Sequence, residues 1–182
     1  EMQTATADCH IGIAGEDKIM NGGTSGGVNN RLFYYEDTTG YAYSYNGPNG
    51  QIYFSTPSDG TQTATYGNTF SSSDTIGCFA DLDNNKLYFA INGTLQNSGT
   101  GISITAPSST TTGNYFFAGQ DRQSGDDTIL EWNFGGTQSF TVSSGNTDDN
   151  GYGNFEYSPN ITGDGSAKSF YACNTKNLAE FG

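Results

Sequence analysis

Residues 74–93 read DTIGCFADLDNNKLYFAING, and no other stretch of the chain is as informative about its fold. Apolar residues fall on every second position in two runs, at 76, 78, 80 and 82 and again at 87, 89 and 91. A period of two is typical of a strand that buries one face. Asp83-Asn-Asn85 between the runs has turn composition, and Asn92-Gly93 favours a second turn with positive φ. The stretch therefore predicts an antiparallel hairpin whose pattern specifies its register.

Shorter strand-like runs, separated by turn residues, recur along the rest of the chain. They lie at residues 11–13, 32–35, 41–45, 52–54, 115–118, 130–134 and 170–173. No segment shows an apolar stripe of helical period. The sequence thus predicts an all-β fold, a two-sheet antiparallel β-sandwich with little or no helix. Long surface loops are expected at residues 15–30, 56–62, 120–127 and 143–154.

The run at residues 130–134 also predicts which side chains are buried. Leu130, Trp132 and Phe134 are expected to point into the core, while Glu131 and Asn133 point outward. With 182 residues the chain has the size of one domain. Residues 174–182 are expected to form a C-terminal tail or linker.

The charge of the chain excludes several classes of function. There are 19 acidic and six basic residues, so the formal net charge is −13. Because phosphate backbones are bound by clustered cations, we expect no nucleic-acid binding and no attraction to anionic membranes. No apolar run is long enough to span a bilayer, so membrane insertion is not expected. We expect no cofactor.

The cysteines and the single histidine do not indicate a reactive centre. Cys9, Cys78 and Cys173 are too few for a disulfide framework, and none has zinc-ligand spacing. We interpret them as small buried or half-buried residues, with a Cys9–Cys173 bridge as the alternative. His10 has no nucleophile in motif context, so a catalytic triad is not supported and a structural role is expected.

Two acidic motifs could suggest a calcium site or a glycosidase. Asp81-x-Asp83-x-Asn85 begins like an EF-hand loop, but Lys86 and Asn92 stand where that loop needs glycine and a bidentate glutamate. The motif is therefore better explained as a turn.

The other acidic residues do not indicate catalysis either. Residues 126–127 and Glu131 resemble paired glycosidase carboxylates, but Ile129 stands where a third acid is expected. Residues 148–149 and Asp164 are interpreted as solvated acidic positions, with weak cation binding as the alternative. We expect no metal site and no enzymatic activity.

The hairpin and two further segments resemble the SPRY domain family. Residues 74–93 match its pattern D-x-I-G-x-x-x-D-x-D…L-x-F-x-x-N-G. Trp132-Asn-Phe-Gly135 followed by Phe140 is similar to the closing N-F-G…F, and His10-Ile-Gly-Ile13 to an early strand. The resemblance implies a concanavalin-like jelly roll. In it, Gly77 would let the sheets approach closely, and Asp81 and Asp83 would hold the hairpin turn.

Both ends of the chain extend the resemblance. Glu1-Met2 resembles the end of the first SPRY strand, which implies that the strand is truncated and that the chain is a piece of a longer polypeptide. Residues 170–180 resemble the segment that closes SPRY-like domains in phage-encoded virion and fibre proteins, although Ala179-Glu180 replaces a proline-bearing end. This resemblance implies localisation at the virion surface or outside the cell.

Aromatic and charged positions provide the candidates for ligand binding. Tyr41, Tyr43 and Tyr45 alternate on one face of a predicted strand and are expected in the core, with stacking on sugar or peptide as the alternative. The candidate binding residues are Tyr41, Tyr43, Asp121 and Arg122. Asn160-Ile-Thr162 fits the glycosylation sequon, which makes Asn160 a candidate for modification.

Three functions follow as hypotheses. The first is a structural or binding module on a phage or virus particle that contacts other virion proteins, a second copy, or a host-surface glycan or protein. The second is a protein- or peptide-binding SPRY module of a cellular protein, which would use the four predicted loops. The third is a lectin-like carbohydrate-binding domain.

Overall fold

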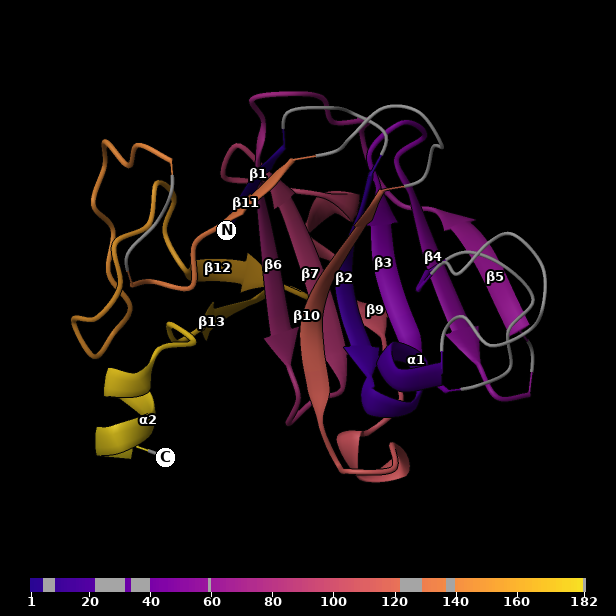
Figure 1. The fold of residues 1–182 in the computed structure, drawn as a ribbon. Coiled ribbons are helices and arrows are strands. Elements are labelled where there is room, and N and C mark those ends of the chain that lie inside the picture. Colours follow the sequence, from indigo (N-terminus) through magenta and orange to yellow (C-terminus); the bar gives the residue numbers. More distant parts are fainter. Residues whose placement is uncertain are drawn as a thin grey trace. The chain divides into compact units, whose positions relative to one another are not determined.

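The fold was taken from a computed structural model, which describes residues 1–4, 9–21, 32–33, 40–58, 60–121, 129–136 and 140–181. Contacts group the chain into two compact units. Figure 1 labels the helices and strands of the chain. Unit 1 contains Glu1–Ala5, Ser72–Ile102 and Ile129–Gly182, and unit 2 contains Thr6–Ser71 and Ser103–Thr128. Each unit contains one large antiparallel sheet, as the all-β prediction requires.

The sheet of unit 1 is built around the predicted hairpin. Its order is β11 (Leu130–Trp132), β1 (Met2–Thr4), β6 (Thr75–Asp81), β7 (Lys86–Ile91) and β8 (Thr94–Leu95), and β9 (Ile102–Ser103) also pairs with β7. A short 3₁₀ helix, η1 (Asn97–Gly99), follows β8. In the hairpin, Ile76 lies opposite Ile91 and Asp81 opposite Lys86. The predicted hairpin and its register are confirmed.

The turns of this hairpin follow the predicted chemistry at Asp81, Asn92 and Gly93. Asn92 and Gly93 have φ values of 48° and 77°, in the left-handed region that Asn and Gly tolerate best. The Asp81 carboxylate accepts hydrogen bonds from the backbone and the side chain of Asn84, at 3.1 Å and 2.9 Å. Gly77 makes room for an aromatic ring, because a Cβ there would lie 2.7 Å from Cε2 of Phe79.

Burial along β7 differs from the predicted alternation. Leu87, Tyr88 and Phe89 are all fully buried, whereas Ile91 is only half-buried. Tyr88 is covered on the second face because Gly101 and Gly163 leave space for its ring, which also packs edge-on against Phe170. Leu82 was expected on the buried face, but it is 41% exposed because β6 ends one residue earlier.

The sheet of unit 2 has five strands. Their order is β10 (Tyr115–Asp121), β2 (Cys9–Gly15), β3 (Ala42–Asn46), β4 (Gln51–Thr56) and β5 (Gly60–Thr65). Strands β2 and β3 are buried along their whole length. Gly12 is required at their contact, because a Cβ there would lie 1.9 Å from the carbonyl oxygen of Tyr43. The 3₁₀ helix η2 (Pro107–Ser109) precedes β10.

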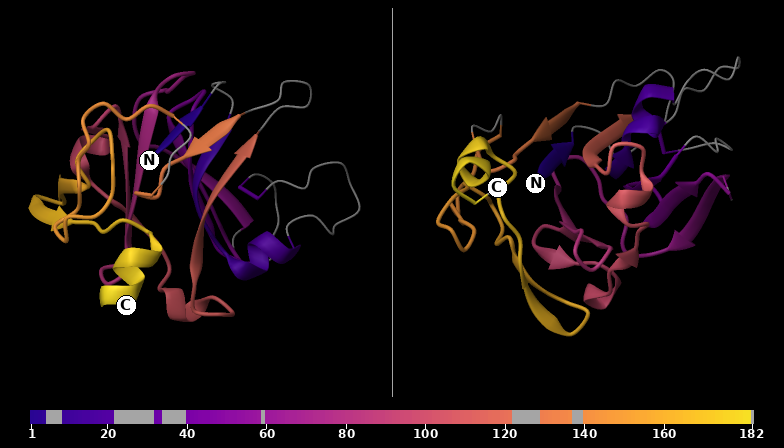
Figure 2. Two further views of the ribbon diagram at one scale, coloured as in Figure 1. Left: turned by 60° about the vertical axis from the view of Figure 1, so that its left-hand side comes forward. Right: turned by 90° about the horizontal axis from the view of Figure 1, so that it is seen from below.

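Helices and one hairpin occur where loops or a tail were expected. Helix α1 (Glu16–Asn21) occupies the start of the predicted loop at 15–30, and α2 (Thr175–Phe181) occupies most of the predicted tail. The strand predicted at 170–173 is absent; β12 (Asn160–Gly163) and β13 (Ser166–Ser169) form a hairpin instead. Figure 2 shows this hairpin and α2 as separate elements of the C-terminal segment.

The reasons for these differences are local turn chemistry and strand composition. Asp164 and Gly165 have φ values of 49° and 74°, so an Asp-Gly turn closes the β12–β13 hairpin. β5 was mistaken for part of a loop because it contains threonines and no large apolar residue. Leu32 and Phe33, the described part of the strand predicted at 32–35, lie in a bend.

Among the described residues, no helix combines the length and apolar character needed to cross a bilayer.

Candidate binding surface

The predicted aromatic site on β3 is largely buried. Tyr43 is 3% exposed, and its hydroxyl donates to Oγ1 of Thr105 at 2.9 Å and accepts from the Thr105 backbone N–H at 2.9 Å. Tyr45 is fully buried against Tyr66 and Phe70. The core interpretation is therefore right for both residues, and the burial of Tyr43 leaves little of its ring for contact with a ligand.

The other candidate binding residues do not converge on one site. Tyr41 is half-buried, and its carbonyl accepts from the N–H of Gly15 at the C-terminal end of β2. Asp121 pairs with Cys9 at the opposite end of the same strand. Arg122 lies outside the described residues. The seven residues of β2 therefore separate Tyr41 from Asp121.

His10 has the structural role that was expected. It is fully buried, and Nε2 lies 3.0 Å from Nδ2 of Asn46 while Nδ1 lies 3.1 Å from Oγ of Ser44. Because an amide nitrogen can only donate, Nε2 accepts and Nδ1 carries the proton. Phe33 stacks on the ring and Tyr53 contacts it edge-on. The arrangement satisfies a buried polar side chain and leaves no access for a substrate.

The cysteines are all free, so the alternative of a Cys9–Cys173 bridge is wrong. Cys9 is buried and Cys78 half-buried, as expected, but Cys173 is exposed. Burial raises the pKa of Cys78 to about 12, which leaves its thiol protonated and unreactive at neutral pH.

The acidic candidates are separated and used within the fold. No group of three potential metal-ligating residues occurs in the described part of the chain. Asp149 accepts hydrogen bonds from Asn160 and Ser169, so the candidate glycosylation residue Asn160, which is exposed at the start of β12, donates its amide to Asp149. Glu131 lies in β11, and residues 126–127 lie outside the described residues.

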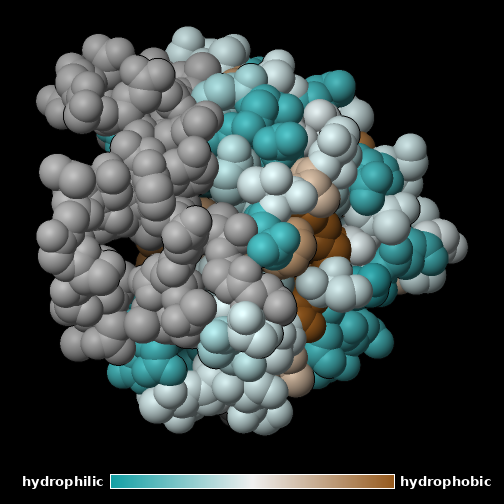
Figure 3. Space-filling model, turned by 90° about the vertical axis from the view of Figure 1, so that its right-hand side faces the viewer, coloured by the Kyte–Doolittle hydropathy of each residue, from teal (hydrophilic) through white to brown (hydrophobic). Residues whose placement is uncertain are grey.

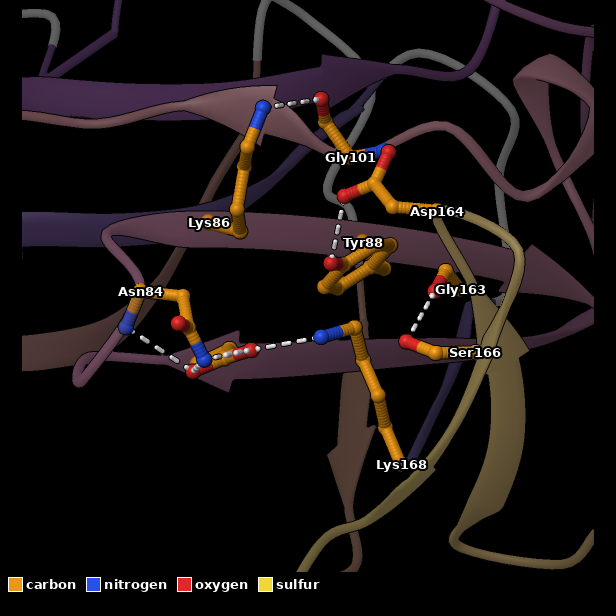
Figure 4. Close-up of polar contacts among 9 residues, drawn as sticks. Asn84, Lys86, Tyr88, Gly101, Gly163, Asp164, Ser166 and Lys168 are labelled. Carbon is orange, nitrogen blue, oxygen red and sulfur yellow. Dashed lines mark hydrogen bonds and ion pairs between the residues drawn. The ribbon is translucent and has the colours of Figure 1, made fainter.

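Polar side chains of the β12–β13 hairpin attach it to β6 and β7 (Figure 4). The Tyr88 hydroxyl donates to Asp164 at 2.7 Å, and Asp164 also accepts from the N–H of Gly101 at 3.3 Å. Lys168 forms an ion pair with Asp81 at 3.1 Å and lies 5.7 Å from the centre of the Tyr88 ring. Lys168 thus helps to hold the β12–β13 hairpin against the β6–β7 hairpin.

The protonation states in this cluster suit attachment better than acid–base catalysis. The hydrogen bond from Tyr88 lowers the pKa of Asp164. Burial and the Asp164 carboxylate together raise the pKa of Tyr88. Burial opposes ionisation of Asp81, but hydrogen bonds from Asn84 and Lys168 outweigh it and lower the pKa of Asp81. None of the three groups is therefore tuned to exchange protons near neutral pH.

Asp148 organises the remainder of the C-terminal segment. It is 4% exposed, and its carboxylate accepts from the backbone N–H groups of Asn150, Tyr152 and Ala172 and from Nδ2 of Asn177. The predicted loop at 143–154, residue 172 and α2 are thus joined through one side chain. The prediction that Asp148 is a solvated acidic residue is therefore wrong.

Glu1 and Asn133 attach this segment to the sheet of unit 1. The Glu1 carboxylate accepts from the N–H groups of Glu156 and Tyr157, at 2.9 Å and 2.6 Å. Asn133 is 1% exposed; its amide donates to the carbonyl of Asn154 and accepts from Gly135. Asn133 was expected to point outward, but β11 ends at Trp132, so the alternation does not continue.

The same strand end places an aromatic side chain at the surface. Phe134 was expected in the core, but it is 41% exposed and stacks on half-buried Trp132, with centroids 5.6 Å apart and planes at 4°. Next to it, a Cβ on Gly135 would lie 2.6 Å from Cβ of Ala172, so the Phe134 and Tyr171 segments adjoin. Tyr171 is 56% exposed.

Leu178 of α2 belongs to the same region. It is 72% exposed, and Asn177 before it donates to the carbonyl of Ala172 at 3.0 Å. We call Phe134 and Tyr171 the aromatic surface. Sequence reasoning missed it because it extended the alternation of β11 by two residues; the glycine at position 135 ends the run only after Phe134, so no local signal marked the strand end at Trp132.

Comparison with known proteins supports the family assignment and nothing finer. No curated protein matches the chain. A family model of the SPRY domain matches residues 2–111, which include the β6–β7 hairpin and are more than half of the 182 residues. The aromatic surface lies beyond the matched range. The resemblance predicted from the hairpin is confirmed, and the chain belongs to the SPRY domain family.

Proposed function

We propose that this chain is a non-enzymatic protein-binding module and that the aromatic surface is its contact region. Membership in the SPRY family supports a protein-binding role. The observation that carries the choice of surface is the exposed Phe134 ring stacked on Trp132. Exposed apolar side chains that adjoin one another are the usual mark of an interaction site.

The chemistry of this surface suits a protein partner. Aromatic side chains dominate the energetics of protein interfaces, because they bury a large area with few rotatable bonds. Asn133 and Asp148 hold the neighbouring backbone through side-chain hydrogen bonds, so little conformational entropy is lost on binding. With a net charge of −13, the chain favours a partner whose rim is basic.

The test compares variants of equally exposed aromatic residues. Phe134→Ala and Tyr171→Ala remove the proposed contact, whereas Phe116→Ala, at a position 45% exposed in unit 2, is the matched control. Proteins captured from extracts of the source by the wild-type chain are identified, and their affinities for each variant are measured. We expect a loss of about ten-fold or more for the first two variants and little change for the control. Equal affinities for all variants would contradict the assignment.

We also propose that the module is displayed on the surface of a virus particle. The support is the resemblance of residues 170–180 to the closing segment of phage-encoded SPRY-like domains. Labelling particles with an antibody against the chain tests this, and electron microscopy should find the label on the particle exterior. Recovery of the chain only as a free cellular protein would refute the display.

A further inference from the structure

Strand β5 forms one end of the five-stranded sheet of unit 2 (Figure 1). It pairs with β4 from Gly60 opposite Thr56 to Thr65 opposite Gln51. Within the described part of the chain, no strand pairs with its other edge. A strand of six residues at a sheet edge presents a row of backbone groups that another chain can use.

The register identifies which backbone groups face outward. The N–H of Tyr66 donates to the carbonyl of Gly50, so this opposed pair is hydrogen-bonded. Hydrogen-bonded and non-hydrogen-bonded pairs alternate along an antiparallel ladder. Residues 60, 62 and 64 therefore bond to β4, while the N–H and C=O groups of Thr61, Thr63 and Thr65 point away from it.

Two features that natural edge strands use to prevent pairing, charged residues and proline, are missing from β5. Residues 60–65 read GTQTAT and contain no charge and no proline, although the chain is strongly acidic. Gln62, Thr63, Ala64 and Thr65 are all exposed. In the view from the side where β5 lies in Figure 1, teal and pale residues surround a narrow brown strip (Figure 3). Backbone pairing, and not burial of a large apolar patch, is therefore the interaction that this edge offers.

The sequence of the strand is complementary to itself. Antiparallel pairing centred on Thr63 places Thr61 opposite Thr65 and Gln62 opposite Ala64, while Thr63 lies opposite its own copy. Threonines opposite each other are favourable cross-strand pairs. A two-fold axis at Thr63 makes the contact identical for both chains, as closed dimers require. An unrelated extended peptide would have no reason to match this symmetry.

We propose that β5 pairs with β5 of a second copy of this chain, in antiparallel register centred on Thr63. The two five-stranded sheets would then become one continuous sheet. Each of the three opposed threonine pairs would exchange two backbone hydrogen bonds. Because both chains carry a charge of −13, their mutual repulsion opposes the pairing, and added salt should strengthen the dimer by screening it.

Cross-linking tests the register. Cys173, the exposed native thiol, is first replaced by serine. Thr63→Cys places two thiols opposite each other at about 5.5 Å between Cα atoms, so a short bifunctional thiol reagent should yield covalent dimer. Thr65→Cys places like thiols four residues apart along the strand, about 13 Å, and should yield none with that reagent. Equal yields from the two variants, or none from either, would overturn the proposal.

Sedimentation measures the association itself. Thr63→Pro removes an outward-facing N–H group. Thr63→Lys places two like charges opposite each other without changing the backbone, and it tests the pairing even if the proline variant fails to fold. We expect either variant to raise the dimer dissociation constant by about ten-fold or more. Thr94→Lys adds the same charge on exposed β8 and should not weaken association. A wild-type chain that stays monomeric as concentration and salt increase, or an unchanged constant in both Thr63 variants, would refute the pairing.

The outcome is separable from that of the proposed binding function. Thr63 lies in unit 2 and the aromatic surface in unit 1. Phe134→Ala should therefore leave the dimer unchanged.

Discussion

The β6–β7 hairpin and the C-terminal residues 140–181 lie in the same unit but are stabilised in different ways. The hairpin is a continuous ladder of six opposed pairs, and β7 buries three large side chains completely. Residues 140–181 have one short hairpin and an isolated bridge between Asn146 and Phe155, and their other segments are joined mainly by side-chain hydrogen bonds to backbone groups, of which Asp148 alone accepts three. The first region depends on apolar burial and the second on a few polar side chains.

This difference implies that the two regions fail differently when they are perturbed. Loss of a buried apolar side chain weakens the packing of the whole unit, because many neighbours contribute to it. Loss of a polar centre leaves specific donors unsatisfied and opens the segment that it organised.

The largest effect is expected in the hairpin. Phe89→Ala removes a fully buried ring and leaves a cavity, so the free energy of unfolding should fall by about 3–5 kcal/mol. Urea denaturation measures this value. Phe116→Ala, at an exposed position in unit 2, should lower the free energy of unfolding by only a few tenths of the loss in Phe89→Ala. Similar losses for the two variants would show that Phe89 is not a core residue.

Removal of the polar centre should open the C-terminal segment with a smaller cost. Asp148→Ala leaves the N–H groups of Tyr152 and Ala172 without their acceptor, which should cost about 2–3 kcal/mol. Hydrogen exchange should accelerate at residues 146–152 and 172–178 while β6 and β7 stay protected. Thr147→Ala, at the exposed preceding residue, is the control. Equal acceleration in β6 and β7 would mean that the two regions are one cooperative structure.

The contact between the two regions can be tested at a single hydroxyl. Tyr88→Phe keeps the buried ring but removes the hydrogen bond to Asp164, and should cost about 1–2 kcal/mol. A double-mutant cycle with Asp164→Ala, which removes the acceptor, measures the coupling between the two side chains. Strictly additive effects would mean that this hydrogen bond does not hold the β12–β13 hairpin.

The smallest effect concerns pH. Burial opposes ionisation of Asp148, but hydrogen bonds from Ala172, Asn177, Tyr152 and Asn150 outweigh it and lower its pKa. Its contribution to stability is therefore complete above the ordinary aspartate pKa of about 4 and is lost as the pH falls through the lower folded-state value. The stability difference between wild type and Asp148→Asn should shrink over that range in urea titrations. A difference that stays constant from neutral to acidic pH would contradict this assignment.

The candidate site was less predictable than the fold. Tyr43 and Phe134 occupy similar positions in alternating runs, yet Tyr43 is buried and Phe134 exposed. The sequence pattern assigned both to the core, and only the end of β11 at Trp132 separates them. Asp121 and Tyr41 are likewise far apart. β10 and β3 both pair with β2, and their registers place these two residues at opposite ends of β2.

The sequence by itself determined the features that depend on residues a few positions apart. Period-two alternation and turn residues such as Asn92-Gly93 specify the β6–β7 hairpin, because its strands pair through a short connection. Tertiary structure decided the burial of both faces of Tyr88, the central position of Asp148 and the attachment of Tyr157 to Glu1, 156 residues away. A local pattern contains no information about such distant partners, since their contact depends on how separate strands and segments come together.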